Sequence, residues 1–270
     1  MRFIGLIAAC WICTVAAGTA SPACAPVPGL ARILSRPHLQ FLLVGEVRGT
    51  REAPQPFFDV VCSGARSGRP VAVVLEDSAD EQAGLDRFMT SRGDAAAREA
   101  FLAPEFWGAA LQDGRTSAAY LGLHVALRTM LARGRIVSVT AVQPGEDDTG
   151  KYEQAMAARI RAAGTRHPAA LVIALLGNFH AARARMPFNA DVVPAGRYLN
   201  AAATVSLAIA DFGGTAWMCA SATDCAAHRI GPSTDKPRGA ILQALPGGTY
   251  DGTLSTGTAA TSSPPPLPQR

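Results

Sequence analysis

The segment LQFLLVGEVRGTREAP, residues 39–54, points to a buried parallel strand with a polar site at its end. Its apolar part, Phe41–Val44, has no polar interruption, which is typical of a strand buried on both faces of a parallel sheet. Glu46, Arg48 and Arg51 follow closely. Open α/β sheets usually place a ligand beyond such a strand end. For this segment alone, an ordinary strand-to-helix turn with a solvated Glu46 explains the pattern equally well.

A second strand of the same kind ends on a second carboxylate. Residues Pro70–Leu75 (PVAVVL) form another apolar run, closed by Glu76, and Gln55–Gly68 between the two runs is typical of a helix. A strand, a helix and a strand in this order form a βαβ unit, whose right-handed crossover brings equivalent strand ends to one edge of the sheet. We therefore expect Glu46 and Glu76 to be neighbours at that edge.

The rest of the chain continues this pattern. A helical insertion is predicted between the second and third strands, with helices at Asp80–Thr90, at Ala95–Leu102 and from about Thr116 or Ser117 to Arg133. Two more strands with a helix between them follow, and then two runs that either join the sheet or form a hairpin beside it: Arg135–Gln143, Thr149–Ala163, Leu171–Leu176, Thr204–Ala210 and Gly214–Cys219. The predicted fold class is α/β, with a mostly parallel sheet flanked by helices.

The composition is that of a globular protein without a nucleic-acid surface. Of the 270 residues, 49% are hydrophobic and 17% are charged, which suffices for a large core. We expect one domain over residues 26–248, with two small domains as the alternative, and a disordered tail over residues 249–270, which is rich in Gly, Ser, Thr and Pro. The net charge of +4 is spread along the chain. The expected partner is a small-molecule or peptide substrate and not a nucleic acid.

The N-terminus predicts export. A charged start precedes the apolar run Phe3–Ala17, and small residues then offer cleavage sites after Ala20, Ala23 or Ala25. A membrane anchor is the alternative, but a spanning helix needs roughly 20 apolar residues and this run is shorter. We expect residues 1–25 to be a signal peptide. The protein would then be periplasmic or secreted, with no stable membrane anchor after signal removal.

The cysteines fit an oxidising compartment. Cys219 and Cys225 are close enough in sequence to close a short loop as a disulfide, and Cys24 with Cys62 would be a second pair if cleavage precedes Cys24. Zinc binding by these cysteines is disfavoured, because no CxxC spacing is present.

Three strand ends carry ionisable side chains: Glu46, Glu76 and, after the fourth strand, His180. If the strands are parallel, these side chains open onto one crevice. A glutamate and a histidine together serve as general base and acid, or as ligands of a divalent metal. Two glutamates held close also raise the pKa of one carboxyl, which suits proton transfer. Nearby arginines would neutralise the pair or grip an anionic substrate through bidentate contacts; the candidates are Arg48, Arg51 and Arg115.

Each candidate also has an ordinary structural explanation. A histidine after an apolar strand is often only hydrogen-bonded, although a tight Gly-Asn turn before His180 favours its exposure. Asp113 and Arg115 share a turn, and Trp107 is either packing or a pocket wall; all three stay substrate-binding candidates. His124, on the last helix of the insertion, is predicted to be structural. The absence of GxSxG, HExxH and P-loop motifs disfavours serine hydrolases, zincins and nucleotidases.

These motifs together resemble a known superfamily. The segment GEVRGT (residues 45–50), Glu76 closing the second strand, and the segment GNFH (residues 177–180) resemble the superfamily that groups erythromycin-esterase-like proteins, the ChaN haem-uptake lipoproteins and the TraB/Tiki proteins. The order of elements agrees, and the resemblance covers roughly Leu39 to Ala220. It implies an α/β core whose site is built from the first turn, the second-strand glutamate and the later GxxH segment.

The branches of this superfamily imply different chemistry. In the esterase-like branch these residues activate water by acid/base catalysis, in the Tiki branch they bind a divalent metal for peptide cleavage, and in the ChaN branch the fold binds haem or iron. Glu46, Glu76 and His180 match the pattern, but Arg48 stands where the first motif has a histidine. This departure argues against metal-dependent and two-histidine mechanisms, because a guanidinium has no lone pair for a metal or a proton.

The first hypothesis is an exported hydrolase acting on an ester, lactone or peptide-like substrate. Glu46 or Glu76 would be the general base and His180 its acid or base partner, with an arginine stabilising the developing negative charge. A metal-assisted variant of this hypothesis would use Glu46, Glu76 and His180 as ligands.

Two further hypotheses stay open, so the sequence leaves undecided whether the chain is an enzyme. A periplasmic haem- or iron-binding protein of the ChaN type would use His180 as axial ligand, aided by Tyr120 or Tyr198. Alternatively, Arg48 marks a catalytically inactive relative. Divalent metal and haem are thus the two cofactors under consideration.

Overall fold

The computed structural model describes residues 23–108, 113–145, 151–209, 213–221, 224–231 and 237–265. The predicted signal peptide, residues 1–25, lies almost wholly outside these ranges. Within them, no helix combines the length and the apolar character that crossing a membrane requires.

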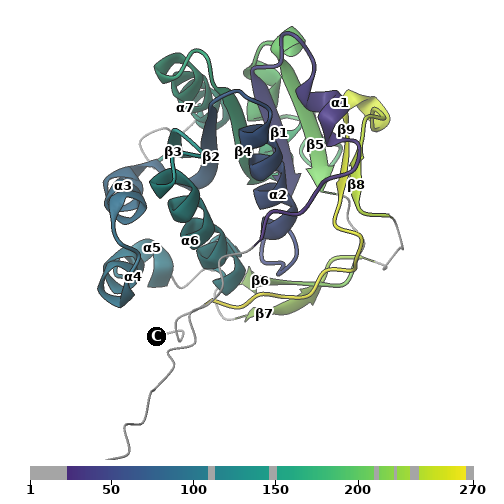
Figure 1. The fold of residues 1–270 in the computed structure, drawn as a ribbon. Coiled ribbons are helices and arrows are strands. Elements are labelled where there is room, and N and C mark those ends of the chain that lie inside the picture. Colours follow the sequence, from purple (N-terminus) through teal and green to yellow (C-terminus); the bar gives the residue numbers. More distant parts are fainter. Residues whose placement is uncertain are drawn as a thin grey trace, which may run out of the picture.

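A seven-stranded sheet forms the centre of the protein, with the strand order β3-β2-β4-β1-β5-β9-β8 (Figure 1). Only β8 pairs in antiparallel fashion, with β9, while every other pairing in this sheet is parallel. The predicted fold class is therefore confirmed. The strands are β1 (Phe41–Glu46), β2 (Val71–Ser78), β3 (Ser138–Gln143), β4 (Leu171–Gly177), β5 (Thr204–Ile209), β8 (Gly239–Ile241) and β9 (Gly252–Ser255).

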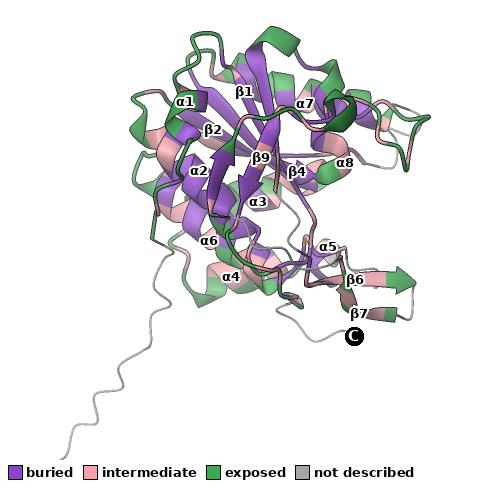
Figure 2. Cartoon of the chain, turned by 90° about the vertical axis from the view of Figure 1, so that its right-hand side faces the viewer, coloured by how far each residue is buried: buried purple, intermediate pink, exposed green. Residues whose placement is uncertain are grey.

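Apolar side chains on both faces of the central strands bury the sheet between two layers. All six residues of β1 are buried, as are all seven of β4 (Figure 2). Alternate residues of β1 enter different core clusters, because side chains of a strand alternate between its faces. Leu42 packs with α1 (Leu30–Leu34), α2 (Pro54–Arg66) and α6 (Ala118–Ala132), whereas Leu43 packs with α7 (Tyr152–Arg166).

The predicted helical insertion is present between β2 and β3. It comprises the 3₁₀ turn η1 (Ala79–Glu81), α3 (Gln82–Thr90), α4 (Ala95–Leu102), α5 (Glu105–Gly108) and α6. The last of these helices was expected to begin at about Thr116 or Ser117, and Ser117 caps it, since its hydroxyl accepts a hydrogen bond from Tyr120 N at 3.2 Å. Asp94 caps α4 in the same way by accepting from Ala97 N at 3.0 Å.

The later strands divide between the two predicted alternatives. β5 joins the main sheet, whereas β6 (Thr215–Ser221) pairs with β7 (Asp224–Arg229) in a separate hairpin, which Figure 2 shows apart from the sheet. This hairpin reaches the first strand-end turn, because Trp217 N donates a hydrogen bond to Gly49 O at 2.8 Å. Gly49 has φ +75°, and a Cβ there would collide with the Trp217 carbonyl. The turn thus requires glycine.

Both predicted disulfides are present. Cys24 bonds Cys62 on α2, and Cys219 bonds Cys225 across the β6–β7 hairpin. The first bond ties the N-terminal end of the described chain to the helix that covers the sheet. Disulfides persist mainly in oxidising compartments, as the prediction of export requires.

The tail predicted to be disordered over residues 249–270 is instead ordered as far as residue 265, so that prediction is wrong for this part. Gly252–Ser255 forms β9, which pairs with β5 and β8. Ser263 is buried, and Tyr250 is buried with its hydroxyl donating to Asn178 O near the end of β4. A Gly- and Ser-rich segment can still satisfy its backbone by adding to a sheet edge, and this one does so. The ordered part of the chain consequently extends well beyond residue 248.

Candidate active site

The ends of β1, β2 and β4 meet at one edge of the sheet, as predicted. Glu46 is the last residue of β1 and lies opposite Gly177, the last residue of β4. His180 follows on the short helix α8 (Asn178–Ala181). Its Nε2 lies 3.4 Å from Oε1 of Glu76, which belongs to β2 between Leu75 and Ser78. Residues far apart in sequence are thus brought together because their strands run the same way.

Glu76 is held as an anion. Its side chain is only 2% exposed, its Oε1 contacts the Arg48 guanidinium, and its Oε2 accepts a hydrogen bond from Gly177 N at 2.6 Å. Burial alone would raise the pKa of Glu76, but Arg48, followed by His180 and Arg115, outweighs that effect and lowers the pKa below its ordinary value. Glu76 is therefore an anchored negative charge rather than a free base.

Glu46 is held in the opposite state. It is 4% exposed. Burial raises the pKa of Glu46 from 4.5 to about 8, opposed by Arg48 and reinforced by the negative charges of Glu76, Asp113 and Asp77. Two adjacent glutamates with pKa values pushed apart are a recurring feature of acid–base sites.

Arg48, Asp113 and Arg115 form a charged network beside Glu76. Arg48 Nη1 donates to Asp113 Oδ2 at 2.9 Å, and Arg115 Nε donates to the same oxygen at 2.8 Å. Arg115 also donates to the Glu76 carbonyl at 3.2 Å and contacts the side chain of Gln143, the last residue of β3. Of the two roles the sequence left open for the arginines, this geometry displays neutralisation. Their contact with a substrate remains a proposal.

Glu153, at the start of α7, contacts His180 from the other side. Its Oε1 accepts from His180 Nδ1 at 2.7 Å, and its Oε2 accepts from Ala195 N at 2.8 Å. Sequence reasoning missed both Glu153 and Gln143. A signal did exist for Glu153, since a carboxylate in the first turn of a helix that follows the third strand lies at the same sheet edge.

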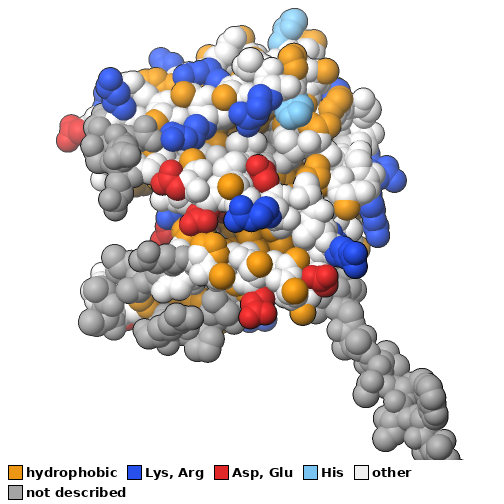
Figure 3. Space-filling model, turned by 90° about the vertical axis from the view of Figure 1, so that its left-hand side faces the viewer, with side chains coloured by type: hydrophobic (Ala, Val, Ile, Leu, Met, Phe, Trp, Pro, Cys, Tyr) orange, Lys and Arg blue, Asp and Glu red, His pale blue; other side chains and the backbone are white. Residues whose placement is uncertain are grey.

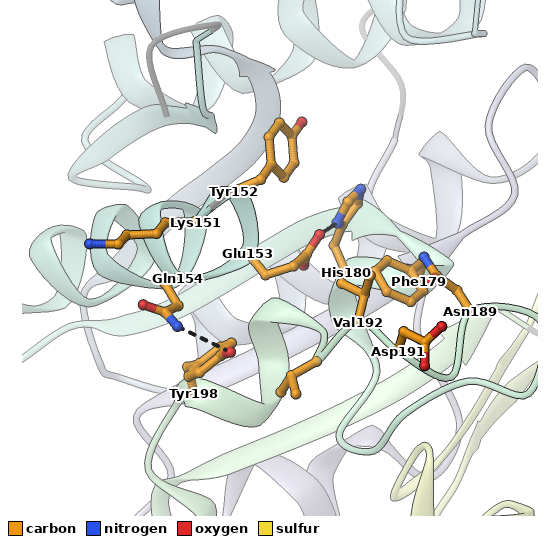
Figure 4. Close-up of a pocket in the computed structure, with 11 residues that line it drawn as sticks. Lys151, Tyr152, Glu153, Gln154, Phe179, His180, Asn189, Asp191, Val192 and Tyr198 are labelled. Atoms are coloured by element: carbon orange, nitrogen blue, oxygen red, sulfur yellow. Dashed lines mark hydrogen bonds and ion pairs between the residues drawn. The ribbon is translucent and has the colours of Figure 1, made fainter. Parts of the chain in front are cut away.

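A pocket of about 540 Å³ opens beside His180 (Figure 4). His180 and Glu153 lie on one side of it, and aromatic, aliphatic and polar side chains complete its lining: Lys151, Tyr152, Gln154, Phe179, Asn189, Asp191, Val192, Val193 and Tyr198. The face of the molecule drawn in Figure 3 is hollowed between an upper and a lower part, with acidic and basic side chains beside the opening. A small organic substrate would fit a pocket of this size and mixed lining.

The structure does not bring two predicted substrate-binding residues to this cluster. Trp107 is 3% exposed and packs with Phe101 at a centroid distance of 5.2 Å, because its ring completes the aromatic core of the insertion. Arg51 is exposed, and in the described part of the chain its side chain has no ion pair with the cluster. The structure thus gives Trp107 the packing role, one of the two roles that the sequence left open, and nothing in this geometry supports a substrate contact for Arg51.

His124 is structural, as predicted. It is 1% exposed, and its nitrogens are hydrogen-bonded to Asp77 Oδ2 at 2.7 Å and to Tyr120 O at 2.8 Å. Burial would lower the pKa of His124, but Asp77 outweighs this and raises it. Tyr120, one of the two tyrosines considered for haem, is itself 2% exposed beneath the cluster.

The residues present do not fit a divalent metal or an axial haem ligand. The Arg48 guanidinium contacts Glu76 Oε1, the oxygen that also faces His180. A metal ion bound by Glu76 and His180 would have to share this oxygen with a positively charged group. Both nitrogens of His180 face carboxylates, which leaves none directed at an iron. Across the described ranges, no cluster of three His, Cys, Asp or Glu residues could hold a metal ion. The side chains suit proton transfer instead.

Comparison with known proteins identifies the fold. No protein-family model and no curated protein match the chain. Among solved structures, an erythromycin esterase, the EreC variant H289N in its open conformation, matches with a TM-score of 0.61 and 10% identity over 87% of this chain and 89% of that one. A succinoglycan biosynthesis protein matches with a TM-score of 0.59 and 10% identity over 76% of this chain and 74% of that one.

A protein from Bacillus cereus matches with a TM-score of 0.57 and 13% identity, covering 77% of this chain and 74% of that one. At these identities the likeness concerns the fold alone. The chain therefore has the α/β fold of the solved erythromycin esterase structure, as expected from its motifs.

Proposed function

We propose that this protein is an exported hydrolase that cleaves an ester, lactone or peptide-like bond with its own acid–base residues. The observation that carries the proposal is the pairing of Glu46, which has a pKa near 8, with a Glu76 carboxylate fixed against His180. A general base works best when its pKa lies near the working pH, and burial tunes Glu46 to that range. The adjoining pocket supplies room for a substrate.

In this proposal the reaction moves two protons. The ionised form of Glu46 takes a proton from a water molecule, whose oxygen bonds to the substrate carbonyl carbon. His180, protonated at both nitrogens, gives the Nε2 proton to the leaving oxygen or nitrogen as the old bond breaks. The Arg48 and Arg115 guanidinium groups offset the negative charge that develops on the carbonyl oxygen. Glu46 ends neutral and His180 ends uncharged, and exchange with solvent resets both.

Replacing either Glu76 or His180 should strongly reduce turnover while preserving the fold. We expect Glu76→Gln and His180→Asn each to lower kcat/KM on the best ester, lactone or peptide substrate by roughly 10²–10⁴-fold, because His180 is the proposed proton donor and Glu76 lies against its Nε2. The measurement is hydrolysis of a substrate panel at pH 8.5, with circular dichroism to check folding.

Matched controls exist on the surface. Glu99→Gln and His38→Asn remove the same chemical groups from exposed positions and should leave turnover unchanged. Full activity in folded Glu76→Gln and His180→Asn would refute the assignment.

A ligand-binding protein without turnover is the second candidate, favoured by the contact of Arg48 with Glu76. If Arg48 marks lost chemistry, wild type should bind panel compounds without consuming them, and Arg48→His should gain hydrolysis. If the hydrolase proposal holds, Arg48→His should lose activity, because Glu76 and Asp113 lose their shared cation. Calorimetric binding beside the hydrolysis assay separates these outcomes.

We also propose that the protein works in the periplasm or outside the cell. The two disulfides and the charged, then apolar, N-terminal sequence support this location. N-terminal sequencing of protein from the periplasmic fraction should find a chain beginning after Ala20, Ala23 or Ala25. Recovery of the intact N-terminus in the cytoplasm would contradict it.

A further inference from the structure

We propose that Glu153 is a positioning residue that keeps a proton on Nδ1 of His180 and so directs Nε2 toward Glu76. The inference rests on the proposed function for its catalytic consequence, but its structural part does not. Glu153 is 8% exposed and uses both carboxylate oxygens. Figure 4 shows its contact with His180 at the pocket wall.

The chemistry of the two partners determines the proton positions. A carboxylate only accepts hydrogen bonds, so the 2.7 Å contact requires a proton on Nδ1 of His180. Nε2 then remains directed at Glu76 Oε1, 3.4 Å away on the opposite side. Glu153 thereby orients the ring and offsets the charge of the imidazolium that the proposed mechanism uses as acid.

The second oxygen of Glu153 holds the contact in place. Ala195 N donates to Oε2 at 2.8 Å, so neither oxygen can rotate away without losing a hydrogen bond. Ala195 begins the 3₁₀ turn η3 (Ala195–Tyr198), which only Pro194 separates from the pocket-lining residues Val192 and Val193. The same carboxylate therefore ties the imidazole to the wall that a substrate would touch.

An ordinary structural role would use only one of these two bonds. If Glu153 served merely to dock η3 onto α7, the bond to Ala195 would suffice and His180 would be free to choose its tautomer. Replacing Glu153 with glutamine separates the two roles, because an amide has one accepting oxygen and one donating nitrogen. If the amide oxygen accepts from Ala195 N, the amide NH₂ faces His180 Nδ1, and a proton on Nδ1 would then place two donors against each other.

The backbone N–H cannot change, whereas the imidazole can. In Glu153→Gln we therefore expect the amide oxygen to keep Ala195 and the amide nitrogen to donate to Nδ1, so that the proton of the neutral ring moves to Nε2. In wild type the neutral ring should carry its proton on Nδ1. Long-range ¹H–¹⁵N spectra of the histidine rings at high pH read this directly, and His180→Asn identifies the resonance.

In kinetic measurements, Glu153→Gln should lower kcat much more than it changes KM. Without a carboxylate behind it, the ring loses the partner that orients it and holds the Nδ1 proton, so kcat should fall by roughly 10²–10³-fold, as for an acid–base group, while KM changes less than about threefold. Glu153→Asp, which keeps the charge on a shorter side chain, should recover part of the loss and restore the Nδ1 proton. Glu99→Gln serves as the matched exposed control.

The two arms keep failure of this inference distinct from failure of the proposed function. An unchanged His180 tautomer in folded Glu153→Gln overturns the inference whatever the activity, and so does an unchanged kcat. If wild type hydrolyses nothing, the spectra alone decide: a proton that moves to Nε2 supports the positioning role, and one that stays on Nδ1 overturns it.

Discussion

Glu46→Gln should make the protein more stable at pH 8.5 and leave it without hydrolytic activity. The pKa of Glu46 is raised from 4.5 to about 8 in the folded protein, so the folded state holds this proton more tightly than the unfolded state does. Its contribution to stability is complete below about pH 4.5 and is lost as the pH rises through 8. The shift corresponds to roughly 5 kcal/mol of unfolding free energy. Glutamine has a similar shape and does not titrate.

The test compares urea unfolding of wild type and Glu46→Gln at pH 4.5 and pH 8.5. We expect similar stabilities at the lower pH and a variant that is several kcal/mol more stable at the higher pH, with kcat/KM below about 1% of wild type because the base is gone. Glu99→Gln, at an exposed position, should follow wild type at both pH values. Parallel pH dependence in wild type and Glu46→Gln would show that Glu46 titrates as an ordinary glutamate.

Arg48→Met should destabilise the folded protein by roughly 3 kcal/mol or more at pH 7, because it leaves the buried Glu76 carboxylate without its cation. Arg48 contacts both Glu76 and Asp113, and its side chain is 20% exposed, which places the effect toward the lower end of the range for buried pairs. Methionine fills much of the same space without charge. Urea unfolding at pH 7 measures the loss.

A double-mutant cycle shows whether the loss comes from the pair. Adding Glu76→Gln to Arg48→Met removes the stranded charge and should recover a large part of the stability, giving a coupling energy of about 2 kcal/mol. Arg92→Met, at an exposed position, should cost little. Additive losses in the cycle would mean that the contact between Arg48 and Glu76 contributes nothing specific.

The fold and the core of the site could be predicted because both follow from buried parallel strands. The apolar runs that end on Glu46 and Glu76 indicate where the strands stop. Because βαβ units have right-handed crossovers, these strand ends lie at the same edge of the sheet. His180 could be added because its segment follows a third such run. The bond between Cys219 and Cys225 also followed from their close spacing, and Cys24 with Cys62 was the second pair on the condition that signal cleavage precedes Cys24.

The remaining features depend on contacts between elements that no local pattern records. The place of Glu153 in the first turn of its helix indicates only the sheet edge, and its hydrogen bonds to His180 and Ala195 follow from how separate elements pack together. The sequence allowed Trp107 to face either a pocket or the core. It faces the core because the insertion packs its ring against Phe101. The segment from Thr249 has the composition of a flexible tail, yet β5 offers it a free edge to pair with.

Glu46, buried at the end of β1, should carry a proton near neutral pH, whereas the neighbouring Glu76 should not. Carboxyl ¹³C spectra of protein labelled at glutamate, titrated from pH 3 to pH 10, test it without any substrate, and Glu46→Gln identifies the resonance. We expect a midpoint near 8 for Glu46 and one below the ordinary value of 4.5 for Glu76. A Glu46 midpoint near 4.5 would contradict it.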